Sequence, residues 1–272
     1  HTRLRTVTGV QTCALPICDP ILDLASPPGV TADRQRRALN AIRDLNLQRL
    51  VETGDPEIAT RIAAYEMAYR MQSSAPELTD LSGESDATLR LYGVEKDKPS
   101  FARNCLLARR LVERGVRFVQ LYTGNQTWDH HGSIRSGLPA ACKYIDKGSA
   151  GLVTDLKARG LLDSTVVHWG GEMGRLPVIQ NDVGRDKVGR DHNTYGFSIW
   201  LAGGGVKGGN IHGATDEFGH KAVENIVNHY DYHATLLHLF GLSPERVSFQ
   251  RASGLGSLLD GQPGRVVQEL LA

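Results

Sequence analysis

Apolar residues recur at helical spacing in two runs near the start of the chain, with a short polar turn between them. The first run places four apolar residues among polar side chains: Leu39, Ile42, Leu45 and Leu50. Thr31 and Asp33 offer caps for this helix, and a second helix is expected after Pro56, beyond the turn at 53–55. The pattern predicts a helical hairpin whose apolar face covers another part of the protein.

From residue 101 onward, helical spacing alternates with short apolar runs. In chain order the predicted elements are a helix over 101–115, a strand over 116–122, a helix over 144–159, strands over 165–169 and 197–201, and a helix over 231–241. Asp231 is expected to cap the last helix. Residues 73–100 are polar and irregular, apart from a short helix that Gly93 ends. The alternation favours an α/β layer with a mostly parallel sheet.

The composition is ordinary for a globular protein and excludes few function classes. The 272 residues are 40% hydrophobic and 22% charged, and 31 basic against 30 acidic side chains leave a net charge of +1. Because basic and acidic side chains are nearly equal in number, the chain has no strong electrostatic field that would attract it to nucleic acid or to an anionic membrane surface. No apolar run reaches the roughly 20 residues that span a bilayer. The four cysteines have neither zinc-site nor redox-motif spacing.

Residues 1–18 differ in character from the rest of the chain. Their sequence, HTRLRTVTGVQTCALPIC, resembles translated sequencing-adapter read-through and forms no convincing signal peptide. We therefore expect this segment to be foreign to the protein, whose natural chain would continue upstream. A genuine disordered leader is the alternative.

Polar clusters stand next to three of the predicted strands, where open α/β sheets hold their sites. The loop after 116–122 carries Asp129 and His131, whose carboxylate and imidazole suit zinc, manganese or iron. Because these residues are two apart, an extended backbone would point both side chains to one side. A polar surface loop without function is the alternative.

The second and third clusters offer two more ligands and two cationic side chains. Glu172 follows the strand at 165–169, and its flanking glycines leave it free to bind a metal or to act as a base. Arg175 is placed to grip an anion. His192 is a candidate ligand, and Arg190 a candidate oxyanion clamp. A Glu–Arg pair in a turn and a merely hydrogen-bonded histidine would explain the same residues without a site.

Three further features give weaker signals. The glycine-rich run at 203–209 lacks the Gly-Lys-Ser/Thr order of a phosphate loop, and we interpret it as a wide turn. His229, Asp231 and His233 are spaced like ligands, but the capping role accounts for Asp231. Ser82 lies in a polar connection and is interpreted as part of a turn, so no nucleophile stands out.

The motifs form an ordered series: WDHHG at 128–132, GEMGR at 171–175, GRDH at 189–192, LAGGGVKGG at 201–209, TDEFG at 215–219 and DYHATLLHLFG at 231–241. Over about residues 20–272 this series resembles the domain of unknown function 1501 family. That family in turn resembles the alkaline phosphatase superfamily, which includes the sulfatases. The resemblance implies a partial doubly wound, mostly parallel α/β sheet with an inserted helical hairpin, and a metal site at the strand ends.

Carried over by position, the resemblance implies four metal ligands: Asp129, His131, Glu172 and His192. Together with the clusters described above, the hypothesis takes three residues as catalytic: Glu172, Arg175 and Arg190. The cofactor would be a divalent metal, namely zinc, manganese, calcium or iron. Two departures weaken the comparison: Glu172-Met173 stands where an Asp-His pair is usual, and the N-terminal part with the nucleophile is missing.

The expected domains are a foreign or disordered segment at 1–18, a helical hairpin and irregular connection at 19–100, and the C-terminal part of an alkaline-phosphatase-like core at 101–272.

Two functions follow as hypotheses. The first is a metal-dependent hydrolase of phosphate or sulfate esters, acting on a small-molecule or glycan ester and inactive as this chain alone, because the nucleophile segment is missing. The alternative is a catalytically silent exported binding protein of the same fold. A metallopeptidase is disfavoured because His-Glu-x-x-His does not occur. The export signal usual in the family implies a periplasmic or cell-surface location, and we expect neither a nucleic-acid partner nor a membrane span.

Overall fold

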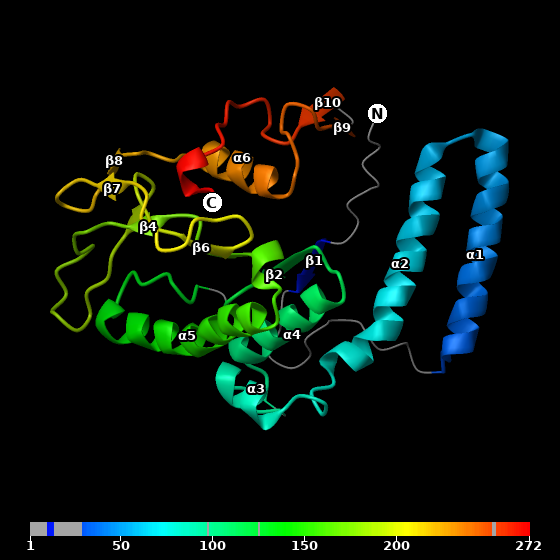
Figure 1. Ribbon diagram of the computed structural model, residues 1–272, viewed down its shortest axis with the longest axis horizontal. Coiled ribbons are helices and arrows are strands. Elements are labelled where there is room, and N and C mark those ends of the chain that lie inside the picture. The colour runs from blue at the N-terminus through cyan, green and yellow to red at the C-terminus, as the bar shows by residue number, and fades with distance from the viewer. Residues whose placement is uncertain (1–9, 14–28, 97, 125, 252–253) are drawn as a thin grey trace. The chain divides into compact units, whose positions relative to one another are not determined.

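A computed structural model of the protein describes all residues except 1–9, 14–28, 97, 125 and 252–253 (Figure 1). The chain divides into two compact units, His1–Gly124 with Ile145–Leu152 and Asn125–Tyr144 with Val153–Ala272. This division falls after residue 124, whereas the sequence suggested a boundary at residue 100. Each unit is described by itself.

The first unit contains the helical hairpin that the sequence predicts. Helices α1 (Ala32–Thr53) and α2 (Pro56–Thr79) pack against each other (Figure 1). Thr31 caps α1 by accepting a hydrogen bond from the backbone nitrogen of Arg34 at 3.2 Å, as expected. Arg36 Nη1 lies 2.9 Å from both carboxylate oxygens of Glu66 and so ties the two helices together. Helix α1 buries none of its residues, so the expected cover over another part of the protein is not found along α1.

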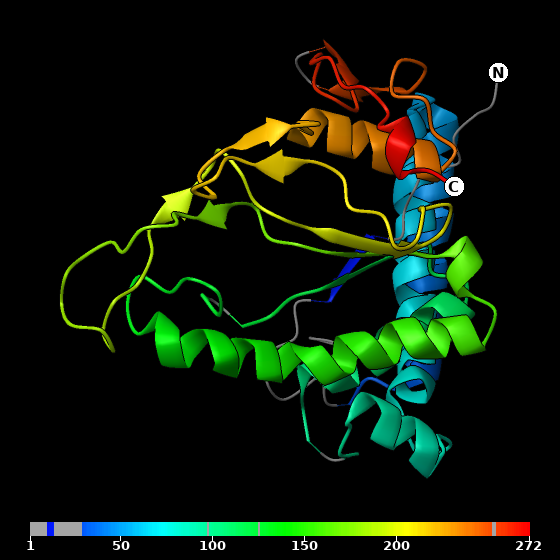
Figure 2. The same cartoon turned by 60° about the vertical axis from the view of Figure 1, so that its left-hand side comes forward.

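The core of the first unit forms around helices α3 (Asp86–Tyr92) and α4 (Phe101–Glu113). Its buried apolar side chains in these helices are Leu89, Tyr92, Phe101, Ala102, Cys105, Leu106, Leu107, Ala108 and Leu111. The middle of the long helix α5 (Ile134–Ala158) packs here (Figure 2). A Cβ atom on Gly151 would lie 2.9 Å from the Cα of Tyr92, so this close approach requires a glycine.

A buried group of charges joins α4 to the turn before α3. Arg109, only 3% exposed, lies 2.7 Å from one carboxylate oxygen of Glu84, and Arg110 lies 2.9 Å from the other. In the same turn Ser82 donates its backbone N–H and its hydroxyl to Asp80, at 2.8 and 2.9 Å. Ser82 therefore belongs to a turn, as the sequence predicted.

Strand β2 (Phe118–Leu121) follows α4 and pairs in parallel with β1 (Val10–Cys13), with Val10 opposite Phe118. Strand β1 lies inside residues 1–18, which the sequence suggested to be foreign or disordered. The remainder of that segment lies outside the described residues.

The second unit contains pairs of short antiparallel strands and helix α6 (His229–Leu239). The pairs are β3 (Val166–Trp169) with β6 (Trp200–Gly203), β4 (Gly174–Arg175) with β5 (His192–Asn193), β7 (Ala214–Thr215) with β8 (Ala222–Glu224), and β9 (Ser248–Arg251) with β10 (Gly254–Ser257). Two 3₁₀ turns, η1 (Leu162–Ser164) and η2 (Gln268–Leu270), complete the unit. The described strands thus form two-stranded sheets, and a doubly wound parallel sheet stays a prediction.

The starts of two elements differ most from those expected. Strand β6 begins at Trp200, not at residue 197, and continues through Gly203. Helix α5 begins at Ile134, not at residue 144, although Pro139 lies inside it. Among the described helices, none combines the length and hydropathy needed to cross a membrane.

Asp231 does not cap α6, and that prediction was wrong. Asn228 is the cap, because its side chain accepts hydrogen bonds from the backbone nitrogens of Tyr230 and Asp231 at 2.8 and 2.9 Å. Asp231 closes the capping box by accepting from the Asn228 backbone nitrogen at 3.3 Å. It also accepts from the backbone nitrogen of Arg265 at 2.9 Å, so this buried carboxylate ties α6 to the C-terminal segment.

Candidate metal centre

Three of the four predicted metal ligands come together in the second unit. Ligand atoms of Asp129, His131 and His192 all lie within 4.8 Å of one another. The Nε2 atoms of His131 and His192 lie 3.0 and 3.1 Å from the same oxygen, Oδ1 of Asp129. The two imidazole ring centres are 4.9 Å apart. The convergence of these three side chains agrees with the sequence prediction.

Glu172, the fourth predicted ligand, is not a member of this group. It is exposed in the turn between β3 and β4. Its assignment as a ligand or a base therefore stays a prediction.

Asp129 and His131 reach the centre from a tight turn. The backbone nitrogen of Asp129 donates to the carbonyl of Gln126 at 3.1 Å, and that of His131 donates to the carbonyl of Asp129 at 3.0 Å. The expectation that an extended backbone would point both side chains to one side was wrong. The loop brings them together by folding back on itself.

His192 reaches the centre from β5, where it stands directly opposite Arg175 of β4. Nη2 of Arg175 lies 2.6 Å from Oδ1 of Asp129, the oxygen that both imidazoles face. Nη1 of Arg175 is buried and has no hydrogen-bond partner among the described residues. Arg175, predicted as an anion contact, is therefore the ion-pair partner of Asp129 and retains an unused donor.

Arg190, the second predicted anion contact, is exposed. Its backbone nitrogen donates to the carbonyl of His130 at 2.9 Å. This bond shows a structural contribution of the backbone, and the oxyanion-clamp role of the side chain stays a prediction.

The connection between β4 and β5 is bonded to the loop that carries Asp129 and His131. Inside the connection, the backbone nitrogen of Leu176 donates to the carbonyl of Asp191, and that of Gln180 to the carbonyl of Gly189, both at 2.9 Å. Three more backbone bonds reach the loop: Ser133 to Lys187 at 3.1 Å, Ile134 to Val188 at 3.0 Å, and Arg190 to His130 at 2.9 Å. These bonds hold the two ligand-bearing segments together.

Gly189 lies where the two segments touch. A Cβ atom built on it would stand 2.0 Å from the carbonyl carbon of His131 and 2.2 Å from its oxygen. Only glycine fits this close approach. In the sequence Gly189 is the first residue of the GRDH motif, and the motif alone does not reveal this constraint.

Gln180 is a second residue that sequence analysis missed. Its Oε1 lies 2.7 Å from Nδ1 of His131, across a separation of 49 residues. No local spacing rule links residues so far apart, and the only signal was a polar side chain in the connection between two candidate clusters.

The electrostatics of the centre favour a charged carboxylate. Hydrogen bonds from His192 and then from Arg175 lower the pKa of Asp129, and these outweigh the opposing effect of desolvation. Asp129 therefore stays ionised through mildly acidic pH. The side chains of His131 and His192 are 40% and 45% exposed, so solvent and small solutes reach the centre.

A family model described as protein of unknown function (DUF1501) matches residues 6–271. The chain belongs to this family. The match includes residues 6–18, which the sequence analysis set aside, and all three converging ligands. No curated protein and no solved structure matches the chain.

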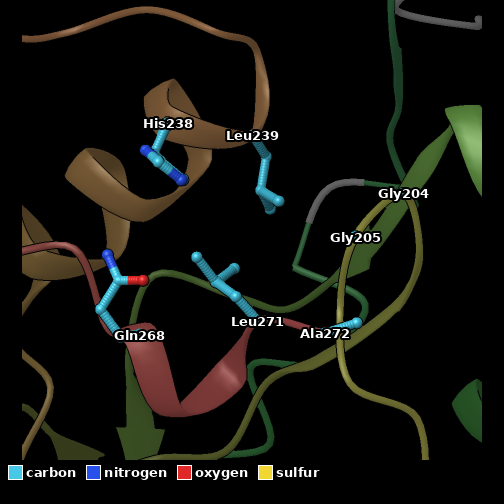
Figure 3. A pocket seen from close by; sticks show the side chains of 7 residues that line it. All are labelled: Gly204, Gly205, His238, Leu239, Gln268, Leu271 and Ala272. Carbon is cyan, nitrogen blue, oxygen red and sulfur yellow. The ribbon is translucent and has the colours of Figure 1, made fainter.

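The other candidate ligands of this DUF1501 protein lie outside the centre. His233 uses Nδ1 to bond the carbonyl of His229 at 2.6 Å, one turn back along α6. A separate hollow of about 390 Å³ lies between α6 and the glycine-rich turn after β6 (Figure 3). It is lined by Gly204, Gly205, His238, Leu239, Gln268, Leu271 and Ala272, so none of the three converging ligands lines it.

Proposed function

We propose that this DUF1501 protein is a metal-dependent hydrolase of phosphate or sulfate esters, with Asp129, His131 and His192 as metal ligands. The observation that carries the proposal is the convergence of these three side chains on one point. Their chemistry and spacing support it, as does the cationic side chain of Arg175 beside them.

The donor set fits a divalent transition metal. Ligands held about 2.0–2.1 Å from a tetrahedral ion lie about 3.3 Å from one another. The 3.0 and 3.1 Å between Oδ1 of Asp129 and the two imidazole nitrogens need only a small opening to reach that spacing. Two imidazoles and one carboxylate suit zinc, iron or manganese better than calcium, which takes six to eight oxygen ligands.

The residues around the centre provide the other requirements of ester hydrolysis. A bound divalent ion would supply Lewis acidity at a coordination position that three protein ligands leave open. Asp129 holds its negative charge because its pKa is lowered. Arg175 places a positive charge beside the centre: its Nη2 is bonded to Asp129, and its buried Nη1 has no partner among the described residues, so it could donate to one oxygen of a phosphate or sulfate group only after a local opening.

Other parts of the proposal rest on the sequence motifs or on the family resemblance. The motifs suggest Glu172 as a base and Arg190 as an oxyanion clamp, and the resemblance suggests a small-molecule or glycan ester as substrate and a periplasmic or cell-surface location.

A second candidate is a silent binding protein of the same family. The contact that favours it is the 2.6 Å bond from Arg175 to Asp129, because this bond neutralises the carboxylate without a metal. The pair Glu172-Met173, where the superfamily has Asp-His, also favours it.

Metal content and ester hydrolysis of the full-length protein test the proposal together. We expect about one zinc, iron or manganese per chain after mild purification, and hydrolysis of an aryl phosphate or aryl sulfate. His192→Ala should lose both properties, whereas His238→Ala, an exposed histidine outside the centre, should keep them. Bound metal without hydrolysis of either ester would favour the silent binding protein, and absence of metal would refute the proposed centre.

A further inference from the structure

We infer that Gln180 is the positioning residue of the metal centre: it accepts the Nδ1 hydrogen of His131 and thereby holds Nε2 of that ring toward the ion. The inference rests on the metal-binding part of the proposed function and is independent of which ester is hydrolysed.

The contact defines which ring nitrogen carries hydrogen. Oε1 of Gln180 lies 2.7 Å from Nδ1 of His131. A carbonyl oxygen accepts hydrogen bonds and donates none, so Nδ1 carries a hydrogen in this arrangement. A neutral imidazole has one N–H, and the other nitrogen, Nε2, then presents its lone pair.

That lone pair meets a carboxylate. Nε2 of His131 faces Oδ1 of Asp129 at 3.0 Å. A lone pair and a carboxylate oxygen at this distance repel each other unless a positive charge lies between them. A metal ion or a proton meets that requirement, and a metal takes the place of the proton when it binds. Gln180 therefore favours the form of the ring that binds a metal through Nε2.

Packing alone does not fix the ring of His131, because its side chain is 40% exposed. An exposed side chain that is held in one orientation loses rotamer entropy, and a specific contact has to compensate that loss. The bond to Gln180 supplies such a contact on the side of the ring opposite the centre.

The backbone places Gln180 firmly. Its own nitrogen donates to the carbonyl of Gly189 at 2.9 Å, and Gly189 stands against the backbone of His131. The carbonyls of the neighbouring Lys187 and Val188 accept hydrogen bonds from the backbone nitrogens of Ser133 and Ile134, in the loop after His131. The amide acceptor is thus attached to the same segment that holds the ligand loop in place.

Three variants of the full-length protein test the inference. Their cobalt(II) affinity is measured by visible absorption and by competition with a chelator. Gln180→Ala removes the acceptor, and we expect metal affinity to fall about 10- to 100-fold. Gln180→Glu keeps an acceptor and adds negative charge, so affinity should equal or exceed that of the wild type. Asn181→Ala removes the adjacent exposed amide and should bind like the wild type.

A second measurement reports the contact itself. In the zinc-loaded protein, ¹⁵N NMR of His131 should show a protonated Nδ1 whose hydrogen exchanges slowly, and in Gln180→Ala this exchange should accelerate. Circular dichroism confirms that each variant is folded. The inference would be overturned if Gln180→Glu or Asn181→Ala lost metal affinity to the same extent as Gln180→Ala.

The outcomes separate this inference from the proposed function. Metal binding that Gln180→Ala leaves within twofold of the wild type overturns the role of Gln180 alone. A weakened Gln180→Ala variant in a protein without esterase activity overturns hydrolysis alone. A wild type that binds no metal overturns both.

Discussion

At the scale of single residues, the centre depends on one oxygen atom. Oδ1 of Asp129 lies within 3.1 Å of Arg175, His131 and His192. Three nitrogen atoms around one carboxylate oxygen leave room for a cation only if one of them moves. The 2.6 Å bond to Arg175 is the contact that a metal ion would have to displace or share.

We predict that Gly189→Ala destroys metal binding. The added Cβ would stand 2.0 Å from the backbone of His131, so the two ligand-bearing segments must separate. Isothermal titration with zinc should show at least a tenfold loss of affinity, comparable with losses on removal of outer-shell partners of metal ligands.

The matched control is Gly208→Ala, where a Cβ would meet nothing within 4 Å. It should bind zinc like the wild type. Retention of wild-type affinity in Gly189→Ala would contradict the structural account of the two segments.

Individual residues were predictable where their chemistry is explicit in the sequence. Asp129, His131 and His192 are ligand types in suggestive motifs, and sequence analysis selected all three. Gln180 and Gly189 act through contacts with His131 that depend on how a long connection folds back. Nothing in their local sequence distinguishes such contacts from those of ordinary loop residues.

At the scale of elements, the pairing of the two-residue strands β4 and β5 determines that the charged side chain of Arg175 lies beside the candidate ligand His192. In β4–β5, Arg175 stands opposite His192, and Gly174 opposite Asn193. Asn193 is 1% exposed and donates to the carbonyl of His220 at 2.6 Å, which anchors β5. A register shift by one residue would turn His192 away from Asp129, because side chains alternate between the faces of a strand.

The start of α6 gives a prediction about stability. Asp231→Ala leaves the backbone nitrogens of Asn228 and Arg265 without their acceptor in two part-buried bonds, and we expect a combined cost of about 2 kcal/mol. Asn228→Ala, which removes the cap itself, should cost only about 1 kcal/mol. Urea unfolding of the two variants checks the order, and equal losses would contradict a role of Asp231 beyond the capping box.

The β7–β8 hairpin gives a prediction about pH. Backbone hydrogen bonds, from His220 first, lower the pKa of Asp216 below its ordinary value. A carboxylate with a lowered folded-state pKa stabilises the fold above its unfolded pKa of about 3.9, and this contribution disappears as the pH falls through the folded pKa. Hydrogen exchange should show the amides of His220 and Lys221 losing protection in that acidic range, after correction for intrinsic rates.

In Asp216→Asn the same amides should exchange faster at neutral pH, and the loss of protection on acidification should disappear. An unchanged acid response in this variant would show that another group controls the hairpin.

Element prediction succeeded where the pattern was long and periodic. The hairpin of α1 and α2 and the core helix α4 follow from helical spacing, and Thr31 caps α1 as expected. The start of α5 was missed because Gly137 and Pro139 usually interrupt helices, whereas here they lie inside one. Strand pairing was not predictable, because strands of two to four residues carry too little pattern to reveal their partners.

At the scale of the whole molecule, the three candidate metal ligands all belong to the second unit. A metal that binds the folded state stabilises it by mass action, by about 2.7 kcal/mol at a free concentration of one hundred times Kd. We therefore predict that zinc raises the Tm of this unit by about 5–10 °C. Calorimetry with and without zinc measures the shift, and His192→Ala should show none.

The backbone bonds between residues 130–134 and 187–190 have a consequence for dissecting the protein. A synthetic peptide spanning residues 125–140 contains Asp129 and His131, yet it lacks Arg175, Gln180 and His192, which contact their side chains. Such a peptide should take up zinc no better than an unrelated sequence with the same amino acids. In the proposed centre, recognition of an ion requires two distant stretches of chain folded onto each other, and we expect neither stretch to suffice alone.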